Sequence, residues 1–144
     1  ILCIPAWRVT DPYHPLGNRW ADSMTCGGDW HSYASINDDW GVIPLTSSIP
    51  TGNRGRRNWQ DDTDHDGEAV RISGYAGDDV AMRLSWGFVQ STGRRRVTAD
   101  YSSDGGMSGS PVIDRDGFVI GIHRDAGPGF IKFDNWIYNK MNSY

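Results

Sequence analysis

The stretch from Asp104 to Val112, DGGMSGSPV, is the most informative part of the sequence. Gly106, two residues before Ser108, lets the backbone turn its N–H inward, and Gly109 leaves room beside the serine hydroxyl. A serine nucleophile needs an exposed hydroxyl and backbone N–H groups aimed at the developing oxyanion, here those of Gly106 and Ser108. A Gly/Ser-rich surface turn is the simpler interpretation. The Ser-Pro-Val that follows, and the Gly-Ile-His at 121–123, favour the nucleophile.

Strand patterns surround this stretch, and only the C-terminus is patterned as a helix. Apolar runs bounded by Gly, Pro or Asp predict strands at residues 1–5, 20–26, 40–45, 69–75, 80–92, 94–101, 110–114 and 118–123. Asp114–Gly117 predicts the tight turn of a hairpin between the last two of these. Apolar residues recur at helical spacing over residues 133–141, which predicts one short amphipathic helix.

Composition narrows both the fold and the function. The chain has 144 residues, and its seven Trp, six Tyr and four Phe need a core, which argues against disorder. Eighteen Gly and seven Pro favour many turns over long helices. The net charge of −4 excludes a generally basic nucleic-acid binder, and no apolar run approaches the roughly 18 residues of a membrane helix. We therefore expect neither nucleic acid nor membrane as a partner.

The chain divides by composition into three parts. Residues 1–45 predict an incomplete β-unit, residues 46–68 a polar linker, and residues 69–144 a fuller β-unit closed by the helix. Within the linker, residues 51–68 carry almost no apolar side chains, which predicts a long solvated connection.

An acidic repeat lies inside the linker. Asp62, Asp64 and Asp66 alternate before Gly67, a pattern typical of loops that bind Ca²⁺, but the flanking helices and the final glutamate of an EF-hand are missing. A solvated acidic loop is the favoured interpretation and a structural calcium the alternative. We expect no required cofactor.

Five segments along the chain resemble motifs of a known protein family. They are ILCIPA at 1–6, NDDWGVI at 37–43, ISGYAGD at 72–78, GMSGSPV at 106–112 and GIH at 121–123. In this order they resemble the chymotrypsin-like serine endopeptidases, most closely the glutamyl endopeptidase branch. The resemblance implies an all-β, chymotrypsin-like double β-barrel whose first barrel is partial in this chain. It also implies a secreted enzyme that acts on polypeptides.

The resemblance assigns roles to individual residues. Ser108 is implied to be the nucleophile that forms the acyl-enzyme, and Asp39 to be the residue that orients the catalytic histidine. Asp38 is the adjacent rival, but the family's motif places its aspartate directly before an aromatic residue, here Trp40. Met107 stands where trypsin-like zymogens carry an aspartate that pairs with a new N-terminal amine. Activation by such an ion pair is therefore not expected.

The sequence departs from the family's pattern at the catalytic histidine, which acts as the general base. The histidines of the chain are His14, His31, His65 and His123. None of them lies in the family's Thr/Ala-x-His-Cys context upstream of the aspartate. We expect the base on a separate N-terminal segment, lost from this chain or held as another one, because the chain opens inside an apolar run like a processed product or a fragment. A non-catalytic homologue that acts as a binding or structural protein is the alternative.

Specificity is expected to depend on His123 and Ser103. The resemblance places His123 on the wall of the substrate pocket, where an imidazole donates to a substrate carboxylate, and Ser103 resembles a threonine whose hydroxyl faces the same pocket. Glu before the scissile bond is therefore the expected preference. Ser102 stands at the position of the trypsin pocket's aspartate, which disfavours Arg and Lys. Asp104 opposes the expectation, since a carboxylate near the pocket mouth repels an acidic substrate.

The cysteines leave two pairings open. Cys3 and Cys26 are the only two in the chain. They pair with each other, or one of them pairs with a segment outside this sequence. An even number of cysteines is compatible with secretion.

Overall fold

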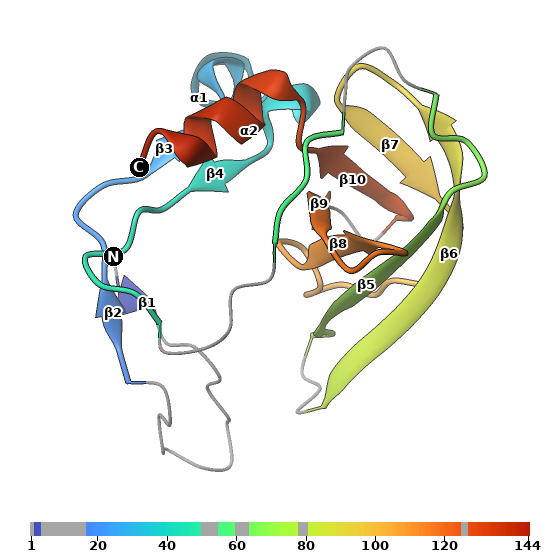
Figure 1. Cartoon of the computed structure of the whole chain (residues 1–144), viewed down its shortest axis with the longest axis horizontal. Helices are drawn as coiled ribbons and strands as arrows, with labels where there is room; N and C mark the ends of the chain where they lie inside the picture. The colour runs from blue at the N-terminus through green and yellow to red at the C-terminus, as the bar shows by residue number, and fades with distance from the viewer. Residues whose placement is uncertain (1, 4–16, 50–54, 60–63, 78–80, 125–126) are drawn as a thin grey trace.

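Strands of the C-terminal half close into a six-stranded barrel in the computed structural model, which describes residues 2–3, 17–49, 55–59, 64–77, 81–124 and 127–144. Around the barrel the strands follow the order β10-β7-β6-β5-β8-β9, and each hydrogen-bonded pair is antiparallel (Figure 1). Their bounds are β5 (Ala69–Tyr75), β6 (Met82–Thr92), β7 (Arg96–Ala99), β8 (Pro111–Asp114), β9 (Val119–Arg124) and β10 (Gly129–Lys132). The predicted all-β architecture is confirmed.

Alternating side chains build the barrel core. In β5, Val70 and Ile72 point inward and are fully buried, and Arg71 between them is half-buried. The buried core consists of Trp59, Val70, Ile72, Ala76, Val89, Val97, Ala99, Tyr101, Met107, Val112, Ile120 and Phe130. Strand β10 was not expected from the sequence. All four of its residues are buried, so the two-residue alternation that marks a half-buried strand is absent there.

The N-terminal unit contains short elements only. Strand β1 (Leu2–Cys3) pairs with β2 (Arg19–Trp20), and β3 (Thr25–Cys26) pairs with β4 (Gly41–Val42). Within the part of residues 1–49 that the structure describes, these pairs are separate sheets and close no barrel. The strand expected over 20–26 is interrupted, and the one expected over 40–45 is reduced to β4.

Two small helices between β3 and β4 were also not expected. Helix α1 (Gly28–Tyr33) ends at Ala34, whose positive φ of 49° stops the helix, and the 3₁₀ turn η1 (Ile36–Asp38) follows directly. Both are too short to produce a helical repeat in the sequence.

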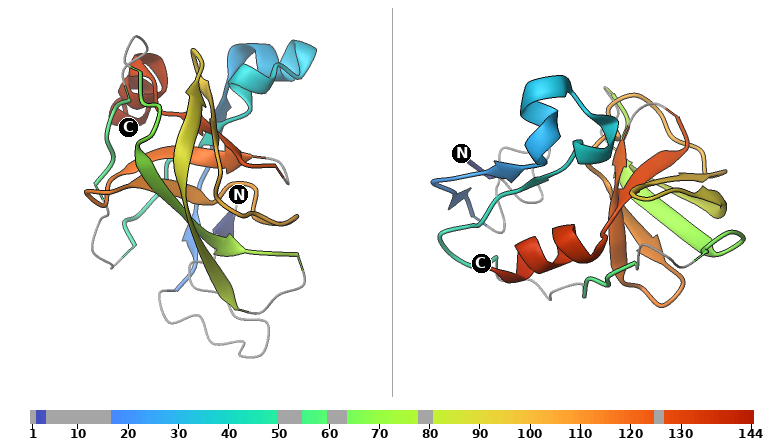
Figure 2. Two further views of the ribbon diagram at one scale, coloured as in Figure 1. Left: turned by 90° about the vertical axis from the view of Figure 1, so that its right-hand side faces the viewer. Right: turned by 90° about the horizontal axis from the view of Figure 1, so that it is seen from above.

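Helix α2 (Asn135–Asn142) joins the two units. It begins one turn after β10, and the Asp134 side chain caps it by accepting a hydrogen bond from the N–H of Ile137 at 2.8 Å. Buried Ile137 packs in a second core with Trp40, Ile131 and Phe133, to which β4 also contributes. Figures 1 and 2 show α2 running from the barrel alongside β3 and β4. The predicted terminal helix is therefore present, shifted by one or two residues.

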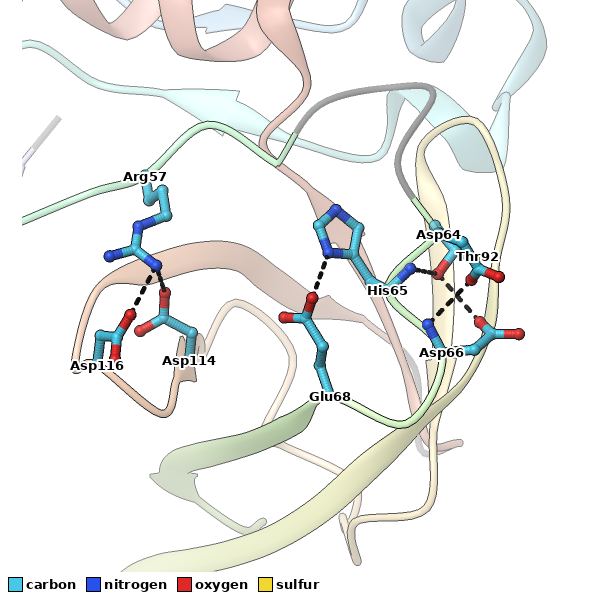
Figure 3. Close-up of polar contacts among 8 residues, drawn as sticks. All are labelled: Arg57, Asp64, His65, Asp66, Glu68, Thr92, Asp114 and Asp116. Carbon is cyan, nitrogen blue, oxygen red and sulfur yellow. Dashed lines mark hydrogen bonds and ion pairs between the residues drawn. The ribbon is translucent and has the colours of Figure 1, made fainter.

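The connection before β5 is less solvated than its composition predicts. Trp59 is 3% exposed and belongs to the barrel core, and the His65 ring stacks on it at 3.9 Å between ring centroids. His65 Nδ1 pairs with Glu68 at 3.0 Å, and Arg57 forms ion pairs with Asp114 and Asp116 (Figure 3). These contacts fasten residues 55–59 and 64–68 to the barrel. No helix in the described ranges is long and apolar enough to span a bilayer.

Candidate active site

Ser108 lies on an exposed turn that tight backbone contacts hold in place. Gly106 and Gly109 have φ values of +97° and +87°, a region that favours glycine. The Gly109 N–H donates to the carbonyl of His123 at 2.8 Å, which ties the turn to β9. Met107 is 1% exposed and packs in the barrel core. The buried Met107 anchors the turn and leaves the neighbouring Ser108 exposed.

The backbone N–H groups beside Ser108 are available to a ligand. Among the described residues, no backbone carbonyl accepts a hydrogen bond from the N–H of Gly106 or of Ser108. A Cβ on Gly106 would lie 2.2 Å from the backbone nitrogen of Gly77, so only glycine fits there. Gly77 in turn donates to the carbonyl of Gly105 at 2.6 Å. The segment at 72–77 therefore supports the turn on which the expected oxyanion hole depends.

A cavity of about 600 Å³ lies between the two units and brings several predicted site residues together. The barrel contributes Ser108, His123 and Arg124 to its lining, and the N-terminal unit contributes Cys26, Asp39 and Trp40. Residues that are 69 positions apart in sequence, Asp39 and Ser108, thus face the same space.

The two adjacent acids, Asp38 and Asp39, occupy different surroundings. Asp38 is buried and pairs with Arg95 at 2.6 Å, and it does not line this cavity. Asp39 ends the 3₁₀ turn, its side chain is 33% exposed, and its Oδ2 accepts from Nε of Arg124 at 3.0 Å. Of the two, Asp39 is the carboxylate that shares a cavity with Ser108.

His123 lines the cavity and is buried. Its Nδ1 lies 2.9 Å from the carbonyl of Gly129 and 3.0 Å from the hydroxyl of Tyr101. A carbonyl oxygen can only accept, so Nδ1 carries a proton and donates. Tyr101 also donates to Gly129, at 3.0 Å, and burial raises the pKa of Tyr101 above that of an ordinary tyrosine. The phenol therefore stays neutral beside the imidazole.

Ser103 and Asp104 do not line the cavity in this structure. The Ser103 hydroxyl donates to the carbonyl of Gly127 at 3.3 Å. Asp104 is exposed and pairs with Arg83 at 2.5 Å, which offsets the negative charge that would oppose an acidic substrate.

The remaining predicted residues are only partly described. His14 and Asp62 lie outside the described residues, as do the side chains of Cys3 and His31. Cys26 forms no disulfide within the described part of the chain. In the acidic loop, Asp64 accepts from the N–H of Asp66 at 3.0 Å, and Asp66 accepts from Thr92 at 3.2 Å (Figure 3). The described residues contain no cluster of three or more acidic, histidine or cysteine ligands for a metal.

Sequence reasoning did not find the Arg124–Asp39 pair or the place of Cys26 in the cavity. Arg124 follows His123 on a strand, so its side chain must leave the opposite face from the buried imidazole. The alternation of side chains along a strand was the signal from which the direction of Arg124 could have been predicted. The partner of Arg124 was not readable from the sequence, because Asp39 lies 85 residues earlier.

A closed six-stranded antiparallel barrel, a serine on a glycine-supported turn and a carboxylate across the same cavity define a chymotrypsin-like serine peptidase fold. The family model of the trypsin-like peptidase domain matches residues 29–122, and the chain belongs to this family.

A solved structure of a Glu endopeptidase in complex with MPD is similar to this chain with a TM-score of 0.80 and 21% identity. The similarity covers 99% of this chain and 70% of that one. Comparison with curated proteins found no match.

Proposed function

We propose that this peptidase domain hydrolyses polypeptides through an acyl-enzyme on Ser108. The single observation that carries the proposal is the shared cavity, into which the barrel presents Ser108 and the N-terminal unit presents Asp39. In the first step the Ser108 hydroxyl adds to the scissile carbonyl and its proton passes to a base; the amine then leaves with that proton. Water hydrolyses the resulting ester. The N–H groups of Gly106 and Ser108 stabilise the oxyanion in both steps.

The base in this proposal is a histidine on an N-terminal segment outside the sequence. Among the residues that line the cavity, His123 is the only histidine, and its Nδ1 is engaged inside the barrel by Tyr101 and Gly129. A histidine that approaches from the N-terminal side would lie between Asp39 and Ser108. The N-terminal unit has short two-stranded sheets at which further strands can pair.

Acidic specificity is the second part of the proposal. His123 lines the cavity and supplies an imidazole that favours a carboxylate. The structural neighbour is itself named a Glu endopeptidase, which agrees with this specificity. We propose Glu before the scissile bond, secretion as the setting of the enzyme, and no required cofactor, with Ca²⁺ at the 62–66 loop as the one structural ion to test.

Profiling of a peptide library with the protein and its N-terminal segment tests this function. We expect cleavage after Glu, loss of all cleavage in Ser108→Ala, and a weaker Glu preference in His123→Ala. Ser143→Ala is the matched control, because the Ser143 hydroxyl donates to the Lys140 carbonyl at the end of α2 and does not line the cavity. Cleavage after Arg, Lys or large aromatic residues would contradict the specificity. A protein that binds peptides with no cleavage would favour the non-catalytic homologue.

A further inference from the structure

Two adjacent acids of the N-terminal unit are each held by an arginine of the barrel unit. Arg95, in the turn between β6 and β7, pairs with Asp38 at 2.6 Å. Arg124, the last residue of β9, pairs with Asp39 at 3.0 Å. The 3₁₀ turn that carries both acids is thereby fastened to the barrel at two points, and one of these points lies inside the candidate active site.

The backbone of β9 directs Arg124 toward Asp39. His123 and Arg124 leave opposite faces of the strand, so the imidazole enters the barrel and the guanidinium faces the N-terminal unit. The pairing of Gly129 with Arg124 holds this end of β9 in the barrel. The Arg124 side chain is only 14% exposed, which limits the screening of its charge by water.

Arg124 occupies one oxygen of the Asp39 carboxylate. Its Nε donates to Oδ2. Within the described residues no group donates to Oδ1, a third of the side chain is exposed, and Asp39 lines the cavity. An orienting aspartate needs one anchored oxygen and one that accepts from the base imidazole. The ion pair between Arg124 and Asp39 anchors Oδ2 and leaves Oδ1 to accept from the imidazole.

We propose that Arg124 is the positioning residue of this active site: it anchors Oδ2 of Asp39 so that Oδ1 is presented to the catalytic histidine. The inference rests on the proposed serine peptidase function and extends it to a residue in the second unit. A guanidinium stays charged at every pH at which such an enzyme works. Arg124 therefore also offsets part of the negative charge that Asp39 exerts on the base.

That charge predicts a direction for the pH profile. Asp39 stabilises the protonated base, and the nearby Arg124 weakens this effect. Without the Arg124 charge the base holds its proton to higher pH, and the acidic limb of the kcat/KM profile moves upward. The other titratable groups that line the cavity among the described residues are His123 and Cys26, and both remain in the variants below.

The test compares Arg124→Gln, Arg124→Lys, Arg124→Ala and the unchanged protein, each with the N-terminal segment proposed to supply the base. We expect Arg124→Gln to lower kcat/KM by about 10- to 100-fold, mostly in kcat, because the base loses its alignment. Its acidic limb should move up by about half a pH unit or more. Arg124→Lys should recover part of the activity, and added guanidinium should partly rescue Arg124→Ala. Arg57→Gln is the matched control, because it breaks ion pairs outside the cavity and should leave the profile unchanged.

Two results overturn the inference alone. One is an unchanged pH profile and kcat in Arg124→Gln while Ser108→Ala is inactive. The other is a loss confined to KM and to acidic substrates, which would make Arg124 a substrate contact. If the unchanged protein with its N-terminal segment neither cleaves peptides nor reacts at Ser108, the proposed function fails, and the inference fails with it.

Discussion

His123 shows how one residue's surroundings restrict its chemistry. The carbonyl of Gly129 commits Nδ1 to donating, so a substrate carboxylate can be recognised only through Nε2. With Nδ1 protonated, Nε2 donates only when the ring carries both protons and a positive charge. Neutral Tyr101 adds no competing charge beside it.

The first prediction follows from this tautomer. The ratio of kcat/KM for a Glu peptide to that for the matching Gln peptide should fall as the pH rises from 5 to 9, since the imidazolium loses its proton. In His123→Ala the ratio should be lower and nearly independent of pH. Measurement of both substrates at each pH removes the effect of the catalytic base, which acts on both equally. A ratio that is constant with pH in the unchanged protein would contradict the role of His123.

The burial of Tyr101 predicts how the stability of the protein depends on pH. Because burial raises the pKa of Tyr101 in the folded state, the stability that it contributes is intact below the unfolded value of about 10 and is lost as the pH rises above it. We expect the free energy of unfolding in urea to fall more steeply above pH 10 in the unchanged protein than in Tyr101→Phe. At pH 7 the variant should lose about 1 kcal/mol with the buried hydrogen bonds. Equal slopes above pH 10 would show that Tyr101 ionises freely.

At the scale of elements, the turn at 104–109 depends on its neighbours in space. The Gly77 backbone packs closely against Gly106, and the Gly109 N–H donates a hydrogen bond to the His123 carbonyl in β9. The buried Met107 fixes the centre of the turn. The two expected oxyanion donors are thus held by parts of the chain on either side of the turn.

Two neighbouring glycines give a matched test of this turn. Gly106→Ala should reduce kcat by about 100-fold or more, because a Cβ there meets Gly77 at 2.2 Å and φ is +97°. Gly105→Ala should have little effect, since nothing lies within 4 Å of its Cβ position. Rates with a Glu peptide, together with circular dichroism to confirm folding, provide the comparison. Similar losses in both variants would argue against a specific oxyanion role for Gly106.

At the scale of the whole molecule, the sequence predicts what depends on local pattern. The bounds of β5 match the expected strand at 69–75, because its alternation and its flanking residues are both local signals. The sequence also placed Ser108 and Asp39 as site candidates, and the fold gives them one cavity. Helix α1 was not predicted because it is too short to show a helical period, and strand β10 was not predicted because all its residues are buried and show no alternation.

The contacts between units were beyond sequence reasoning for a different reason. Arg124 with Asp39, and Arg95 with Asp38, join residues 85 and 57 positions apart. The burial of Trp59 depends in the same way on the barrel that closes around it. Residues 51–68 are mostly polar, so the sequence predicted a solvated connection. A single tryptophan gives no periodic signal from which its burial could have been predicted.

The most direct measurement is the rate at which Ser108 reacts with a fluorophosphonate probe, followed by mass spectrometry of the labelled peptide. With the N-terminal segment present, Ser108 should label far faster than any other serine, and Asp39→Asn should slow it by several orders of magnitude. Because the proposal places the base on that segment, the 144-residue chain alone should label slowly. Rapid labelling of the lone chain would show that the base lies within it, with His14 the first residue to mutate. Absence of labelling with the segment bound would contradict the account.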